Sequence, residues 1–275
     1  MTEQCAIDNE FSLLRLMPPV LRARDFRLYT DGGSSAGGRR RLVDLWQNGG
    51  AAILGHTPPS LLRELKNTAS RGLYAPFPHF LQGRYEKALS RLFPGRNFRF
   101  YATPVPELET LVANGSAALW RPFIDPASPL SVGENPAPIL IPVVPGIQLW
   151  RGGLPVGLCP LAIAPGAATT LPPSDFLPPL LLACAVRGIY DLIAAAPQRA
   201  QVAYPRIERA LKNSHWQRHG LYLSLRQTPS GEEWAALFRR FLDSGFLLPP
   251  VPTQPAILPG VLSPGEEAVL AELLG

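Results

Sequence analysis

The chain has 275 residues, of which 46% are hydrophobic and 17% are charged. This length is enough for one large domain or two modest ones, and this balance of apolar and charged residues excludes an intrinsically disordered chain. The net charge of +5 comes mainly from arginines scattered along the sequence, with a single run at 39–41, so we expect no nucleic-acid partner.

Hydrophobic periodicity and turn residues predict a mixed α/β order in the first part of the chain. A Gly- and Ser-rich loop at 31–40 joins the first two strands. The predicted elements are a short helix at 8–18, strands at 26–30, 41–46 and 97–101, helices at 60–69, 82–92 and 107–120, and short strands at 139–144 and 156–158.

Beyond residue 170 the pattern changes, and helices alternate with short strands. The predicted helices are 180–195, 198–211, 231–244 and 264–274, and the predicted strands are 221–225 and 246–248. This alternation predicts a compact α+β domain at the C-terminal end of the chain.

The cysteine content is typical of a reducing compartment. Cys5, Cys159 and Cys184 are odd in number and lack the spacing of a metal site, and the last two lie in apolar contexts that predict buried thiols. The apolar run 177–186 is too short for a membrane span, and no signal peptide is visible. We therefore expect a cytoplasmic protein with no membrane partner and no bound metal.

Three segments, taken in chain order, carry a family resemblance. In the first, Val43-Asp44 is followed by Ile53-Leu54-Gly55-His56 and then by Pro59; the second is GGLPVG at 152–157, and the third is GFLLPP at 245–250. Together they resemble the class III, pyridoxal-phosphate (PLP)-dependent aminotransferases, in particular the glutamate-1-semialdehyde aminotransferase branch.

The resemblance implies the α/β architecture of fold type I. We expect an N-terminal segment at 1–30, a reduced aminotransferase-like large domain at 31–169 and a small α+β C-terminal domain at 170–275. Because class III enzymes are dimers that share their active sites, the resemblance also implies a homodimer, or a heterodimer with a full-length aminotransferase homologue.

The sequence departs from the family where the cofactor chemistry takes place. Counting back from the GGLPVG segment, the family's cofactor-binding lysine falls at Gln148, and an amide cannot form the required imine. The phosphate-binding turn falls at 102–106, where Pro104 and Pro106 remove N–H donors. The family's acidic strand has no counterpart in 136–146, and the chain is shortened between 120 and 142. We therefore expect no bound PLP.

The residues that would line or approach the altered site form the candidate set. His56 and His79 are candidate acid–base groups, each with the alternative of a structural histidine in a loop. The candidate ligand-binding residues, each with a structural alternative, are Gln148, Arg151, Asp31 and Asp44.

Two functions remain open. The first is a cofactor-free pseudo-aminotransferase that binds a partner subunit or a small molecule. The second is a PLP-independent enzyme that uses the altered cleft for a biosynthetic cyclisation, dehydration or condensation.

Overall fold

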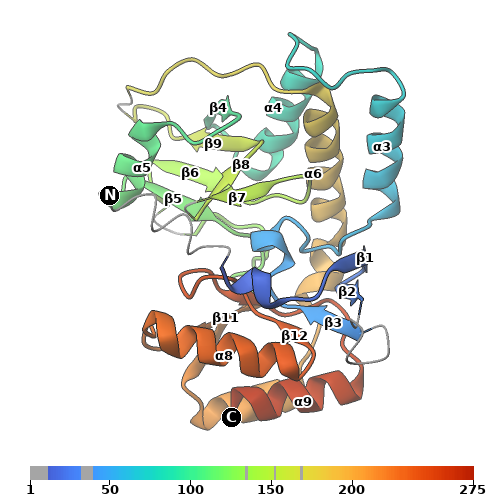
Figure 1. Cartoon of the computed structure of the whole chain (residues 1–275). Helices are drawn as coiled ribbons and strands as arrows, with labels where there is room; N and C mark the ends of the chain where they lie inside the picture. The colour runs from blue at the N-terminus through green and yellow to red at the C-terminus, as the bar shows by residue number, and fades with distance from the viewer. Residues whose placement is uncertain (1–11, 32–39, 134–135, 152, 168–169) are drawn as a thin grey trace. The chain divides into compact units, whose positions relative to one another are not determined.

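The structure is a computed structural model that describes residues 12–31, 40–133, 136–151, 153–167 and 170–275 (Figure 1). The chain forms two compact units, one from residues 1–57 with 198–275 and the other from 58–197. These units divide the chain at other positions than the segments 1–30, 31–169 and 170–275 expected from the sequence. Most of the predicted loop 31–40, and Gly152 of the GGLPVG segment, lie outside the described residues.

The first unit contains two sheets and the helices of the C-terminal part. One sheet has the strand order β1-β2-β3-β12 and the other has the order β10-β11-β13. Its strands are β1 (Val20–Arg24), β2 (Arg27–Thr30), β3 (Arg40–Asp44), β10 (Trp216–His219), β11 (Tyr222–Leu225), β12 (Phe246–Leu247) and β13 (Ala256–Ile257). Its helices are the 3-10 turns η1 (Leu13–Leu16), η2 (Gln47–Gly50) and η3 (Leu211–Asn213), and α7 (Pro205–Ala210), α8 (Gly231–Asp243) and α9 (Pro264–Leu274).

Helices α8 and α9 begin where their sequences predict. Each starts with a capping box: the serine before the helix, Ser230 or Ser263, exchanges backbone-to-side-chain hydrogen bonds with the glutamate three residues later, Glu233 or Glu266. Helix α8 buries four apolar side chains at a helical spacing, namely Trp234, Phe238, Phe241 and Leu242. These side chains belong to the core of this unit.

The second unit is built on a four-stranded sheet with the order β4-β9-β6-β5. Its strands are β4 (Asn97–Tyr101), β5 (Ala117–Trp120), β6 (Ile139–Pro142), the short hairpin β7 (Leu149–Arg151) and β8 (Leu154–Val156), and β9 (Cys159–Ile163). Its helices are α3 (Pro59–Ala69), α4 (Leu81–Leu92), α5 (Pro106–Ala113) and all but the last three residues of α6 (Pro179–Ala200). The two central strands, β6 and β9, are buried along their whole length, as expected for strands covered on both faces.

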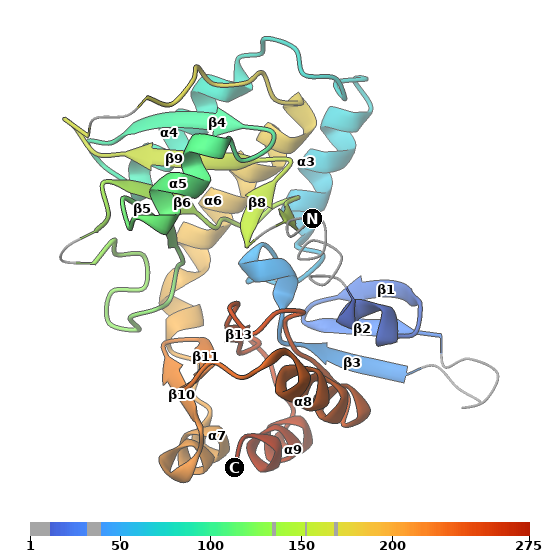
Figure 2. The ribbon, with the colours of Figure 1, turned by 60° about the vertical axis from the view of Figure 1, so that its left-hand side comes forward.

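Both faces of this sheet are covered by helices. Figure 2 shows α5 in front of the sheet and α4 and α6 behind it. On the α5 side, a cluster of buried side chains fills the space between helix and sheet; it consists of Tyr101, Leu108, Ala117, Ile139, Ile141, Leu154, Cys159, Leu161 and Ile163. The sheet with its two helical layers confirms the predicted α/β fold class.

Helix α6 is long and apolar enough, by length and composition, to cross a membrane. Half of its most apolar window is buried inside the protein, and it carries a charged pair, Arg187 with Asp191, one turn apart. The Asp191 carboxylate also accepts a hydrogen bond from Ser60 Oγ in the first turn of α3. These contacts make α6 part of the packed interior of the second unit. A core helix of a globular protein can meet the same criteria of length and composition as a membrane-spanning helix.

The structure corrects several of the predicted elements. The predicted helix 107–120 ends at Ala113, because Gly115 adopts a left-handed φ of 77° and the chain then enters β5. Pro197 does not separate two helices, since α6 continues through it to Ala200. Strands β1 and β10 were missed because arginine and other polar residues interrupt their apolar pattern.

A glycine in α6 lets a loop pass against the helix. An added Cβ at Gly188 would lie 1.9 Å from the carbonyl oxygen of Pro145, far closer than two such atoms can approach. The neighbouring Gly146 also approaches the helix, at Ala185. The absence of a side chain at 188 therefore allows the loop that leads from β6 to β7 to lie directly against α6.

Gly188→Ala should lower the free energy of unfolding by at least about 2 kcal/mol, because backbone must move to make room for the methyl group. Gly83→Ala in α4 is the matched control: nothing lies within 4 Å of its added Cβ, so alanine should stabilise that helix by about 0.5–1 kcal/mol. Urea unfolding followed by circular dichroism measures both effects. Equal effects in the two variants would contradict the close packing at Gly188.

Candidate functional site

Asp44 and His56 are brought together in the first unit. The two side chains were separate candidates in the sequence, and the structure places His56 Nε2 2.7 Å from Asp44 Oδ2. Asp44 is buried, whereas 18% of the His56 side chain is exposed. The other carboxylate oxygen, Oδ1, accepts hydrogen bonds from the backbone N–H groups of Trp46 (2.8 Å) and Gln47 (2.9 Å).

This pair closes a strained turn that follows β3. Gln47 and Asn48 both have a φ of 48°, in the left-handed region that non-glycine residues rarely occupy. The side chain of Gln47 is completely buried, and its Nε2 donates to the carbonyl oxygen of Ile257 (2.9 Å). Asp44 therefore holds both the turn and the imidazole in fixed positions.

The glycine of the Leu-Gly-His motif meets a specific requirement of this turn. Gly55 has a φ of 96°, and an added Cβ would meet the backbone of Asp25 at 3.2 Å. The next residue, His56, donates its backbone N–H to the carbonyl oxygen of Asp25 (2.7 Å). The motif thus fastens the end of the turn to the β1–β2 connection and sets the position from which the imidazole reaches Asp44.

Asp31 does not join this pair. It follows β2, whereas Asp44 ends β3, and the two strands are antiparallel with Thr30 opposite Arg40. The two carboxylates therefore lie at opposite ends of the strand pair, roughly 15 Å apart along it. Asp31 is exposed, and its side chain makes no hydrogen bond or ion pair within the described part of the chain.

Gln148 and Arg151 lie in the second unit and point to different sides of the hairpin. Gln148 is buried, and its Nε2 donates to the carbonyl oxygen of Leu158 (2.9 Å), just before β9. Arg151 is exposed on β7, three residues further on. Because one side chain is buried and the other is exposed, the amide and the guanidinium do not converge on one ligand.

His79 lies beside the start of α4. Its Nδ1 accepts a hydrogen bond from the backbone N–H of Leu81 (3.2 Å), and its ring packs on Phe80 with the centroids 4.3 Å apart. These contacts correspond to the structural alternative for this histidine, because they give a partner to an N–H group at the helix start.

The buried thiols are poor nucleophiles. Cys159 and Cys184 are both buried, as predicted. Burial raises the pKa of Cys159 to about 12, and burial followed by the nearby Glu64 raises the pKa of Cys184 to about 11. At neutral pH both cysteines are thiols rather than thiolates. In the described residues there is also no group of three side chains that could hold a metal ion.

Ser174 and Asp175 were missed by the sequence reasoning. Asp175 Oδ2 accepts a hydrogen bond from the backbone N–H of Ala102 (2.9 Å), and Ser174 Oγ accepts one from Phe100 N–H (3.2 Å). The two residues therefore cover the outer edge of β4 where it leads into the turn 102–106. The available signal was slight, since it consisted of one Ser-Asp pair in a proline-rich stretch.

Asp44→Ala should lower the free energy of unfolding by about 3 kcal/mol, because it leaves the buried N–H of Gln47 without its acceptor and releases His56. Asp31→Ala, which removes the same charge from an exposed position, should change it by less than about 0.5 kcal/mol. Urea denaturation of the two variants gives the comparison. A similar loss in both would contradict a structural role for the Asp44–His56 pair.

Comparison with known proteins shows which fold these residues occupy. No family model matches the chain. An uncharacterized protein of Treponema pallidum is 29% identical over 286 residues, which cover 90% of this chain and 91% of the relative.

Among solved structures, the ornithine δ-aminotransferase of Plasmodium falciparum aligns over 100% of this chain and 97% of its own, with a TM-score of 0.61 and 13% identity. The acetylornithine aminotransferase of Elizabethkingia anophelis aligns over 94% and 92%, with a TM-score of 0.58 and 12% identity. At these identities the similarity establishes the fold alone. The chain has the aminotransferase fold.

Proposed function

We propose that the protein is a cofactor-free pseudo-aminotransferase, a shortened relative of the class III enzymes that has lost their lysine and binds a partner subunit or a small molecule. The aminotransferase fold supports the kinship. The observation that carries the proposal is the position of the lysines.

The chain has three lysines, Lys66, Lys87 and Lys212. All three are exposed, on α3, α4 and η3. A lysine that forms an imine with a cofactor needs an amine held in a pocket, with its pKa lowered so that it can act as a nucleophile. None of the three lysines has such surroundings, and this supports a protein that does not use PLP.

Gln148 occupies the position that the resemblance gives to the lysine. Its side chain is buried, and the hydrogen bond to Leu158 makes it part of the packing between the β7–β8 hairpin and β9. A lysine at this position would bring a charge into buried surroundings. The Gln148 amide therefore has a structural role, which supports the proposal that this position does not bind a cofactor.

The turn 102–106 offers little to a phosphate group. The N–H of Ala102 is already bound by the Asp175 carboxylate, and Pro106 at the first position of α5 has no N–H. The first turn of α5 also carries Glu107 and Glu109, whose charges repel an anion. A phosphate-binding turn needs free N–H donors and a positive environment. Here one N–H group is already bonded, one is missing, and the nearby side chains are negatively charged.

The partner that we propose is a second copy of the chain or a full-length aminotransferase homologue. The loop 72–80 between α3 and α4 exposes three aromatic side chains, Tyr74 at 60%, Phe77 at 53% and Phe80 at 59%. Aromatic residues gathered on one exposed loop are a frequent component of protein interfaces. We place the assembly in the cytoplasm, in agreement with the reduced cysteines that the sequence predicts.

The alternative is a PLP-independent enzyme, and the Asp44–His56 pair is the observation that favours it. A carboxylate that orients an imidazole leaves the other ring nitrogen, Nδ1, available for proton transfer. His56→Asn separates the two functions. The variant should abolish turnover if His56 is an acid or base, and it should leave partner binding intact.

Addition of PLP to the purified protein should produce no saturable internal-aldimine absorbance band, because no lysine lies in a suitable pocket. Borohydride reduction followed by mass mapping detects adducts on Lys66, Lys87 or Lys212. Gln148→Lys should also fail to give the band, since the turn 102–106 lacks the donors that a phosphate needs. A saturable band that a single Lys→Arg variant abolishes would overturn the proposal.

The double variant Phe77→Ser with Phe80→Ser should weaken self-association at least tenfold, since aromatic anchors commonly dominate the stability of an interface. Sedimentation velocity over a concentration series measures the dissociation constant. Val261→Ser, which changes an exposed apolar residue of the first unit, is the control and should leave it unchanged. Wild-type protein that remains monomeric throughout, alone and with the homologue, would refute the proposed partner.

A further inference from the structure

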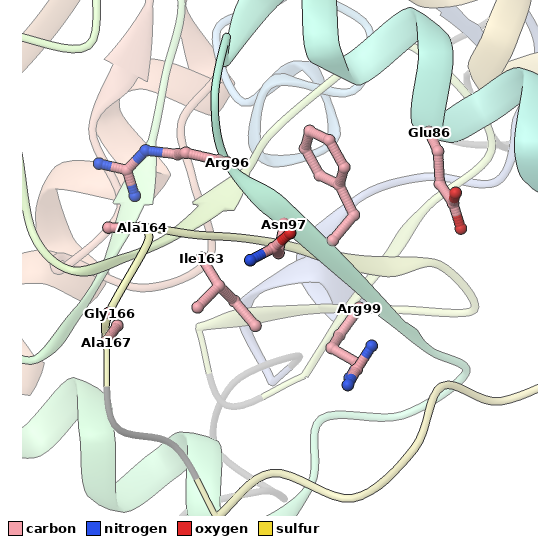
Figure 3. Close-up of a pocket in the computed structure, with 9 residues that line it drawn as sticks. Glu86, Arg96, Asn97, Arg99, Ile163, Ala164, Gly166 and Ala167 are labelled. Atoms are coloured by element: carbon pink, nitrogen blue, oxygen red, sulfur yellow. The ribbon is translucent and has the colours of Figure 1, made fainter.

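A pocket of about 490 Å³ opens at the edge of the sheet in the second unit (Figure 3). It lies where β4 begins and β9 ends, and therefore at the opposite end of β4 from the turn 102–106. None of the six candidate residues from the sequence lines it. Its volume is within the range of small-molecule binding sites.

The pocket has one apolar wall with a defined conformation. Ile163 at the end of β9 continues into the segment 164–167, in which Ala167 N–H donates to the carbonyl oxygen of Ala164 (3.2 Å). Ala167 also packs against the buried cluster under α5. The wall is thereby fixed to the core of the unit.

Arg96 is fixed at the rim of the pocket by carbonyl groups. Its Nη1 donates to the carbonyl oxygens of Pro138 (3.0 Å) and Ala162 (3.0 Å), and both of its Nη atoms lie 3.3 Å from the carbonyl oxygen of Ala137. No carboxylate pairs with it in the described part of the chain, so its positive charge is not neutralised. Burial lowers the pKa of Arg96, and an arginine guanidinium keeps its charge in proteins.

Arg99 and Asn97 supply donors that the fold does not use. They are two residues apart on β4, so their side chains leave the strand on the same side, and both are exposed. Neither side chain makes a hydrogen bond or an ion pair with another described residue. Among the described residues of the lining, Glu86 is the one carboxylate, and Figure 3 shows it on α4, across β4 from Ile163.

We propose that this pocket binds a small organic anion through a carboxylate or phosphate group. Arg99 and Asn97 donate hydrogen bonds to the anionic group, Arg96 adds a second positive charge, and the apolar part of the ligand lies against Ile163 and Ala167. Arginine suits this role because its planar guanidinium donates two parallel hydrogen bonds to a carboxylate or phosphate. With two arginines against one glutamate, the lining keeps a net positive charge. This site does not depend on the cofactor-free function proposed above.

Calorimetric titration of the full chain with succinate and, separately, with inorganic phosphate tests the site at constant ionic strength. We expect saturable binding of at least one anion, and the comparison of the two distinguishes a carboxylate site from a phosphate site. Arg99→Gln should raise the dissociation constant at least tenfold, which corresponds to about 1.4 kcal/mol.

Arg71→Gln is the matched control, because Arg71 is an exposed arginine of the same unit that lies outside the pocket. It should bind the anion as the wild type does, and thermal melting checks that both variants are folded. Absence of saturable binding of both anions by the wild type would overturn the proposal. An equal loss of affinity in the Arg99 and Arg71 variants would also overturn it, since it would show a general effect of net charge.

Discussion

Val43 N–H donates to the carbonyl oxygen of Gly245 (2.8 Å), and Leu45 N–H donates to that of Leu247 (2.9 Å). These two hydrogen bonds pair β3 with β12 in parallel, although the whole second unit lies between them in the sequence. The joint is reinforced by Arg40, whose guanidinium donates to carbonyl groups at the end of α8, where a positive charge is favourable. This pairing joins the two separate stretches of the chain that make up the first unit.

The same pairing positions the turn that carries Asp44 and His56. Leu45 also accepts a hydrogen bond from Ile257 N–H (2.7 Å), so the chain that enters the turn is bound on the C-terminal side as well. The buried Asp44 carboxylate has all of its described contacts inside this arrangement. The contacts of Asp44 therefore stabilise the fold. Any chemistry at His56 has to use Nδ1, the ring nitrogen that Asp44 does not contact.

The sequence predicts structure correctly where the prediction depends on a single helix or strand. Residues 97–101 were predicted as a strand with the bounds that β4 has, and the helix starts at Ser230 and Ser263 follow from local capping chemistry. The sequence predicts each candidate residue separately, because contacts between them depend on strand pairing, which periodicity does not encode. The Asp44–His56 contact needs a left-handed turn at two non-glycine residues, which no local preference predicts.

The predicted approach of Asp31 and Asp44 to one site also depended on pairing. Asp31 follows β2 and Asp44 is the last residue of β3, and the antiparallel pairing of the two strands separates them. The pocket beside β4 could not be predicted from the sequence for a similar reason, since Arg99 gains its neighbours from β9 and from the segment 164–167. Charged residues are common on short strands. A role in lining a pocket can be recognised only when the strand order shows that β4 is at the edge of the sheet.

The division of the chain has a consequence for synthesis on the ribosome. The second unit is continuous, from 58 to 197, and its sheet pairs strands within that stretch, so it can fold as soon as it has emerged. Strand β3 is made earlier but receives β12 only after residue 247, so the first unit has long-range contacts that form slowly. The N-terminal strands must therefore remain without their partner while the second unit forms. During that time the edge of β3 that later pairs with β12 is exposed, so it can bind chaperones or aggregate.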